Sequence, residues 1–337
     1  MKYLIVADPA FIGHTPNLFD FFDRGKVDLP DNREDRARGV MLGLAVGNLL
    51  GIPVEGLSRE SIRRRLPNGV KEIDPGEKQM AMDDDLAQAV DLGGSLLDGD
   101  DGPVNVNWVE NFTERLVRWR RENGRGIGIT TSAVIELLEN GDPPPEAGKV
   151  IYDKNGQIAP NGAVMRCAPV ALLWHSRPAQ LIEDSAASAM VTHYSPLCQW
   201  SCVIINAAIA LLLDGIVPDF ASLARAAGSA GAPSEVAEWV EEVGPDVESL
   251  RWNHRHIGHT LLCMQFGLWA AQTPLGLEEA LVKVMDAGGD SDTNGAVAGA
   301  VLGARYGASA IPERWLNCIP QRERLEELAM RLWNAAP

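Results

Sequence analysis

The 337-residue sequence predicts an all-α protein with one domain, residues 36–337, behind an N-terminal extension, residues 1–35. Apolar residues recur at helical spacing along most of the chain, whereas the alternation typical of strands is almost absent. No repeat or low-complexity linker divides the domain. The expected helices, besides one beginning near residue 36, cover 84–97, 105–121, 130–139, 163–174, 197–214, 234–243, 257–271, 277–286 and 322–334. The exception is residues 149–159, where Asn155-Gly156 between apolar flanks predicts a small β-hairpin.

Two rows of glycines support the single domain. The first is Gly39, Gly43, Gly47 and Gly51, and the second is Gly295, Gly299, Gly303 and Gly307. A spacing of four places each row on one helix face, and each interior glycine costs a helix about 1 kcal/mol relative to alanine. Close packing of the two helices would compensate for this cost, so we expect them to pair in the core. A membrane dimer is excluded because Arg36, Arg38 and Arg305 do not belong in hydrocarbon.

Composition narrows the function classes. The formal charge is −16, with 46% hydrophobic residues, so we expect a folded protein that binds neither nucleic acid nor a membrane surface. The apolar run at the N-terminus ends at Asp8, which is too short for a signal peptide. No uninterrupted apolar run is long enough to span a membrane. The five cysteines form no CxxC pair, which indicates neither a disulfide framework nor a thiolate zinc site. A cytoplasmic location is expected.

The extension, residues 1–35, is rich in aromatic side chains. It holds four of the seven phenylalanines, namely Phe11, Phe19, Phe21 and Phe22, around a predicted helix that begins near Thr15-Pro16. Two interpretations stay open. The segment packs onto its own domain, or it docks a partner protein through its aromatic rings.

Two acidic clusters carry the predicted chemistry. Met82-Asp83-Asp84-Asp85 and Asp290-Ser291-Asp292-Thr293 each precede a predicted helix. Helix capping explains one aspartate per helix better than several, because two carboxylates about 4 Å apart repel by about 4 kcal/mol at an effective dielectric constant of 20. If the glycine-faced helices pair, both clusters could meet around Mg²⁺, Mn²⁺ or Ca²⁺, with room for two ions. An EF-hand is excluded because Val301 stands where its final glutamate should be.

Six segments together resemble the ADP-ribosylglycohydrolase family, in that family's order along the chain. They are RARGVMLGLAVGNLLGIPVEG (36–56), MDDD (82–85), GIGITT (126–131), NGAVMRCAP (161–169), THYSP (192–196) and AGGDSDTNGAVAGAVLGARYGASAIPERW (287–315). The resemblance implies an all-α orthogonal helical bundle that holds two Mg²⁺ or Mn²⁺ ions and binds an ADP-ribosyl group.

The resemblance also implies roles for single residues. The metal ligands would be Asp83, Asp84, Asp290, Asp292 and Thr293, and the catalytic residues Glu55, Asp83, Asp84 and Asp292. The substrate-binding residues would be Gly126 and Gly128 in the GIGITT loop, Asn161 and Gly162 at the diphosphate, and His193. On spacing alone, His193 could equally be a core histidine.

Two positions depart from the family pattern. Met82 replaces a threonine ligand and Asn48 an aspartate, so one cation is expected to bind more weakly, with water or Asp85 filling the gap. The implied activity is hydrolysis of the bond between ADP-ribose and a protein arginine. Serine-linked ADP-ribose and a free ADP-ribosyl metabolite remain open as substrates. The alternative function is an immunity protein that blocks an ADP-ribosyltransferase toxin through residues 1–35, with or without hydrolase activity.

Overall fold

The computed structural model describes residues 30–97, 99, 104–250 and 257–337, which form helices and no strands. The α-helices are α3 (Arg33–Gly51), α4 (Arg59–Arg65), α5 (Asp84–Ser95), α6 (Trp108–Glu122), α7 (Ile129–Glu139), α8 (Pro144–Lys154), α9 (Ala168–Trp174), α10 (Pro178–Met190), α11 (Pro196–Leu213), α12 (Phe220–Ser229), α13 (Ser234–Glu241), α14 (Thr260–Gln272), α15 (Leu277–Ala287), α16 (Ser291–Tyr306), α17 (Glu313–Leu316) and α18 (Arg322–Ala335). Short 3₁₀ helices are η1 (Ile52–Val54), η2 (Pro75–Gln79), η3 (Val164–Arg166), η4 (Val247–Ser249) and η5 (Ala308–Ala310).

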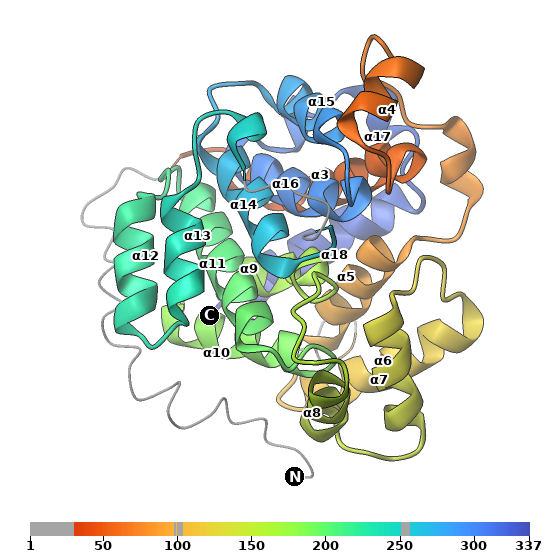
Figure 1. The fold of residues 1–337 in the computed structure, drawn as a ribbon, viewed down its shortest axis with the longest axis vertical. Coiled ribbons are helices and arrows are strands. Elements are labelled where there is room, and N and C mark those ends of the chain that lie inside the picture. Colours follow the sequence, from red (N-terminus) through yellow and green to blue (C-terminus); the bar gives the residue numbers. More distant parts are fainter. Residues whose placement is uncertain (1–29, 98, 100–103, 251–256) are drawn as a thin grey trace.

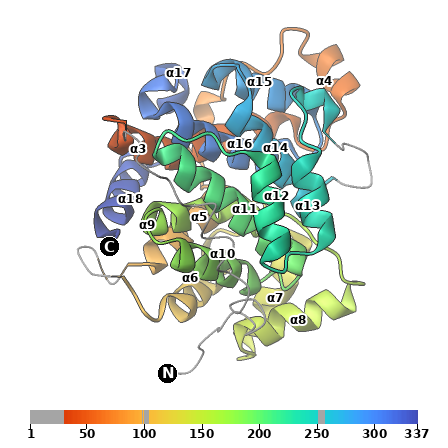
Figure 2. The same ribbon diagram turned by 90° about the vertical axis from the view of Figure 1, so that its left-hand side faces the viewer.

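Helices α3 and α16 form the centre of the molecule and contact each other along their length. Helices α11, α14, α15 and α18 pack around this pair. Figures 1 and 2 show α12 and α13 side by side at the periphery, with α6, α7 and α8 gathered away from the central pair. The first and last helices of the described chain thus share one core.

The two glycine rows lie in direct contact, as predicted. A Cβ atom built on Gly43 would lie 2.1 Å from the carbonyl oxygen of Gly299, and one on Gly47 would lie 1.9 Å from that of Gly295. The pairing is antiparallel, since the earlier Gly39 meets the later Gly303. No side chain fits between the two backbones, so the helix pair depends on glycine at these positions.

The predicted hairpin at residues 149–159 is wrong. Residues 144–154 form α8, and Gly156 follows with φ of 72° while the Gln157 N–H donates to the Tyr152 carbonyl at 2.9 Å. This hydrogen bond is typical of a helix C-terminus that ends in a residue of left-handed conformation, here Gly156. Asn-Gly favours such a residue in a hairpin turn and in a helix cap alike, which is why the motif misled the prediction.

The other predicted helices are present, with ends that shift by a few residues or, at 163–174, with η3 and α9 in place of one helix. Helices α4, α10, α12 and α17 were not predicted. The predicted helix near Thr15 lies outside the described residues, as does most of the N-terminal extension. All five cysteines are buried and free of disulfide bonds.

Residues Arg33–Val54 and helix α11 are long and apolar enough to cross a bilayer by length and composition alone. In each, 83% of the apolar window is buried inside the protein. Both helices therefore serve as core helices of this domain.

Substitution within the glycine rows tests the central contact. We expect Gly43→Ala to lower the free energy of unfolding by about 3 kcal/mol or more, because the helices must move apart to admit the methyl group. Gly228→Ala in α12 is the matched control, since nothing lies within 4 Å of the added Cβ. The control should gain about 0.5–1 kcal/mol. Urea unfolding measures both, and equal effects would contradict the packing argument.

Candidate functional site

The glycine contact leads directly to the site. At its end, a Cβ on Gly51 would lie 2.3 Å from the Cα of Asp292. Glu55 follows four residues later, and its loop is held to the loop before α16 by two backbone hydrogen bonds: Gly56 N–H to Gly289 O at 2.8 Å, and Gly289 N–H to Leu57 O at 2.9 Å. Backbone contacts thereby bring Glu55 beside Asp292.

Glu55, Asp290 and Asp292 form the first acidic group. One carboxylate oxygen from each lies within 4.8 Å of the others. Asp290 is the N-cap of α16, but its side chain accepts no capping hydrogen bond. Asp292 is buried, whereas Glu55 is exposed to solvent. The aspartates therefore do more than cap a helix.

Asp83, Asp84 and Asp85 form the second acidic group at the start of α5, again with oxygens within 4.8 Å of one another. All three are buried. Asp83 is the N-cap of α5, and it too makes no side-chain capping bond. Asp85 is not among the five ligands that the resemblance implies, and the sequence predicted for it only the filling of a gap at the weaker cation.

The two groups meet. The Thr293 hydroxyl on α16 donates to Asp85 Oδ2 at 3.5 Å. The pKa of Asp84 is raised to about 8, mainly by burial and secondly by the charge of Asp83. The charges of Asp290 and Glu55, which belong to the first group, raise it further. Burial and the charge of Asp290 raise the pKa of Asp292 to about 9. Six carboxylates from three segments therefore lie close enough for their charges to interact.

Several oxygens in and beside the two acidic groups lack hydrogen-bond donors. Oδ1 of Asp85, Oδ1 of Asp292 and Oδ1 of Asn48 are buried without a hydrogen-bond partner among the described residues. Unpaired buried oxygens are costly, and mutually repelling carboxylates add to the cost. A divalent cation would coordinate the unpaired oxygens and also neutralise the repulsion between the carboxylates, so the residues fit such an ion.

The two departures from the family pattern have different surroundings. Asn48 is fully buried and its amide donates to Asp83 Oδ2 at 3.4 Å. Met82 is buried as part of the hydrophobic core, and its backbone oxygen accepts from Asn123 Nδ2 at 2.9 Å. Neither supplies a carboxylate or hydroxyl oxygen in place of the expected ligands.

The GIGITT loop borders the acidic groups. A Cβ on Gly126, where φ is 78°, would lie 2.4 Å from Asp83 Oδ1 and 2.5 Å from Asp84 Oδ1. Gly128 caps α7 with open space beside it. Just before the loop, Arg125 forms a bidentate pair with Glu77 at 2.9 and 3.1 Å, and its Nε lies 3.8 Å from Asp83 Oδ1. Arg125 is thus a site residue that sequence reasoning missed.

The NGAVMR segment borders the site from another direction. Asn161 Nδ2 donates to Asp290 Oδ2 at 2.9 Å. Gly162 packs against His193, since a Cβ there would lie 2.9 Å from His193 Nε2. His193 is buried, and burial followed by the charge of Arg166 lowers its pKa to about 3. His193 is therefore a neutral imidazole in contact with the predicted substrate loop.

Comparisons with known proteins agree with this geometry. Residues 29–337 match the model of the ADP-ribosylglycohydrolase family. An uncharacterised protein of Archaeoglobus fulgidus is 34% identical over 312 residues, covering 89% of this chain and 96% of that protein. The ADP-ribosylarginine hydrolase Tri1 of Serratia proteamaculans is 28% identical over 313 residues, covering 90% of this chain and 80% of that protein.

A solved structure called an ADP-ribosylglycohydrolase-related protein complex aligns with a TM-score of 0.72 and 29% identity, covering 91% of this chain and 100% of that chain. The family match over nearly the whole described chain and the shared fold lead to one conclusion. This chain belongs to the ADP-ribosylglycohydrolase family.

Proposed function

We propose that this chain hydrolyses the N-glycosidic bond between ADP-ribose and an arginine side chain of a modified protein. The observation that carries the proposal is the meeting of two groups of three carboxylates, which include buried oxygens without donors and which the Gly126 and Asn161-Gly162 segments adjoin. The Serratia relative, named an ADP-ribosylarginine hydrolase, supports the choice of arginine.

Two divalent cations, Mg²⁺ or Mn²⁺, fit the donor set because every candidate ligand is a hard oxygen. Asp83, Asp84, Asp290, Asp292 and Thr293 would hold them, and Asp85 lies close enough to Thr293 to join this set. When bound, such ions orient ribose hydroxyls and stabilise developing charge as Lewis acids.

The chain's own residues supply the remaining tasks. Glu55 is the most exposed carboxylate of its group, but the partial burial of its carboxyl group, followed by the charges of Asp290 and Asp83, raises its pKa. A raised pKa makes Glu55 a better proton acceptor, so we assign it to water activation or proton transfer. Gly126 carries no side chain to block the approach of a ligand to Asp83 and Asp84, and Asn161 fixes Asp290.

The linkage is the finer part of the proposal. Arginine-linked, serine-linked and free ADP-ribosyl substrates share the ADP-ribose but differ at the bond that breaks. A panel of the three, assayed with Mg²⁺, Mn²⁺ or EDTA, separates them. Metal-dependent release from the arginine conjugate above the other two is the expected result.

Asp292→Asn tests whether the two acidic groups are needed for activity. We expect ADP-ribose release to fall by at least about 100-fold, because a ligand and its charge are lost. Removing one of several mutually repelling carboxylates should leave the melting temperature in EDTA unchanged or higher. Full activity in this variant would contradict the assignment.

Asp184→Asn is the matched control. Asp184 is also shielded from solvent and has a raised pKa of about 7, caused mainly by burial, but it accepts a hydrogen bond from Trp174 Nε1 at 2.6 Å away from the acidic groups. The rate of ADP-ribose release by the Asp184→Asn variant should stay within about twofold of the wild-type rate. A loss equal to that of Asp292→Asn would mean that general destabilisation explains both.

Met82→Thr tests the weaker cation. A hydroxyl at this position restores the ligand type of the family pattern, so we expect the weaker site to bind Mn²⁺ roughly tenfold more tightly. Isothermal titration of the metal-free protein measures this affinity. Met82→Leu keeps the buried apolar side chain and should bind like the wild type. Identical titrations for all three proteins would remove Met82 from the metal argument.

A second candidate function rests on the extension. The family match begins at residue 29, so residues 1–28, with four of the seven phenylalanines, lie outside it. We propose as the alternative that the extension, residues 1–35, binds and blocks an ADP-ribosyltransferase toxin, with or without hydrolase activity in the remainder of the chain.

Replacing Phe19, Phe21 and Phe22 together by alanine in the full chain tests this alternative. Clustered aromatic side chains often dominate an interface, so transferase binding should weaken by more than about tenfold while hydrolysis stays unchanged. Surface plasmon resonance and ADP-ribose release measure the two. Unchanged binding with a large fall in melting temperature would instead show that the segment packs onto its own domain.

A further inference from the structure

Arg166 is a fully buried cation beside the proposed substrate loop. It ends η3, five residues after Asn161. A buried guanidinium is costly unless its N–H groups find acceptors. Among the described residues no carboxylate lies within ion-pair distance of Arg166, and its acceptors are neutral: Gln88 Oε1 on α5, Thr192 Oγ1 at 2.6 Å and the Ser188 carbonyl at 3.4 Å. Its guanidinium also lies 5.0 Å from the ring centre of Phe112.

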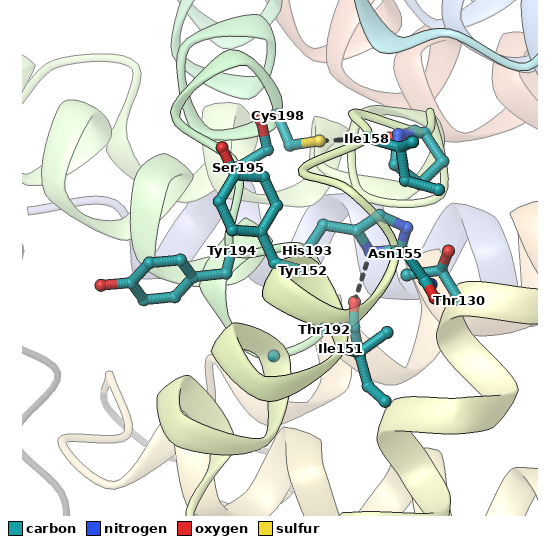
Figure 3. A pocket seen from close by; sticks show the side chains of 12 residues that line it. Thr130, Ile151, Tyr152, Asn155, Ile158, Thr192, His193, Tyr194, Ser195 and Cys198 are labelled. Carbon is teal, nitrogen blue, oxygen red and sulfur yellow. Dashed lines mark hydrogen bonds between the residues drawn. The ribbon is translucent and has the colours of Figure 1, made fainter.

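Thr192 connects this cation to His193. Thr192 Oγ1 lies 2.7 Å from His193 Nδ1, a bond drawn as a dashed line in Figure 3. Arginine can only donate, so the Thr192 oxygen is the acceptor toward Arg166. The Thr192 hydroxyl hydrogen remains available to another acceptor, and among the described residues the one within hydrogen-bond distance is His193 Nδ1, so we infer that Thr192 donates to it.

This order of donors fixes the imidazole. If Nδ1 accepts, a neutral ring must carry its hydrogen on Nε2. The ring is neutral at physiological pH because burial and Arg166 lower the pKa of His193 to about 3. Nε2 faces Gly162, where an added Cβ would lie 2.9 Å away, and no described acceptor hydrogen-bonds to it.

We propose that Arg166 is a positioning residue that, through Thr192, holds His193 in the Nε2–H tautomer and so presents one fixed donor beside Gly162. The substrate class that fits is an oxygen acceptor of the ADP-ribosyl group lying along the Asn161-Gly162 segment. This last step rests on the proposed function, whereas the tautomer does not.

Arg166 acts on more than one part of the site. Through Gln88 it contacts α5 one turn after Asp84 and Asp85, and through Thr192 it contacts the segment between α10 and α11. The same side chain therefore links the acidic helix to the histidine. Arginine carries several N–H groups in a rigid plane, so one side chain can donate to Gln88 and to Thr192 at once. The single ammonium group of lysine lacks this planar arrangement of donors.

The tautomer is tested on the full-length protein by ¹⁵N NMR of labelled histidine, with His193→Gln used to assign the signals. The wild type should show Nδ1 as the unprotonated nitrogen and Nε2 as the protonated one. Thr192→Val removes the hydroxyl at nearly constant shape and should give a mixture of both tautomers. Thr192→Ser keeps the hydroxyl and should restore the wild-type pattern.

Binding and turnover give the second readout. For Thr192→Val we expect the Kd of ADP-ribose and the KM of the arginine conjugate to rise about 5- to 10-fold, as for one lost hydrogen bond, with kcat within about twofold. Thr192→Ser should stay within about twofold in all three. A merely structural threonine would lower the melting temperature without changing the tautomer.

Arg166→Met, if it folds by thermal melting, should match Thr192→Val, and the double variant should be no worse than either, because both interrupt one chain of bonds. A wild-type signal with hydrogen on Nδ1, or an unchanged tautomer in Thr192→Val, would overturn the proposal whatever the activity. A confirmed tautomer in a protein that neither binds nor releases ADP-ribose would instead overturn the proposed function.

Discussion

The contact between the backbones of α3 and α16 is the constraint on which the rest of the structure depends. Two helix axes can approach this closely only where neither carries a side chain, and three successive turns of each helix meet that condition, with Gly39, Gly43 and Gly47 facing Gly303, Gly299 and Gly295. The contact fixes the sliding position of one helix on the other, since glycine must face glycine. It therefore also fixes the loops that leave the two helices, which carry Glu55 and Asp290.

The acidic site at the end of helices α3 and α16 destabilises the fold. Burying the carboxyl groups of Asp84, Asp85 and Asp292, whose pKa values burial raises, costs free energy, and so do the unpaired oxygens of Asp85 and Asp292. The packed helix pair and its surrounding helices must offset that cost. Such a balance is typical of functional sites, where groups are placed for a ligand and not for the protein alone. The charges are confined to one end of the core, so the remainder of α3 and α16 packs as ordinary apolar structure.

The sequence predicted the parts of the structure that follow from spacing or charge. The glycine rows could be recognised because their cost in a helix requires a partner, and the acidic runs because their repulsion requires a cation. The hairpin failed because Asn155-Gly156 specifies a left-handed residue without specifying which element it ends. The network of Arg166, Thr192 and His193 could not be predicted, because it depends on side chains from separate segments. Arg166 itself did carry a signal, as a charged residue inside the apolar run from Ala163 to Trp174.

The pairing of the first described helix with one near the end of the chain has a consequence during synthesis. Helix α3 leaves the ribosome early, but the surface that covers its glycine face is not made until residues 291–306 have emerged. Until then a long apolar helix has no permanent partner, and such intermediates are prone to aggregate. The protein therefore completes its core and its acidic centre in one late event, and a nascent chain cut short before α16 holds neither.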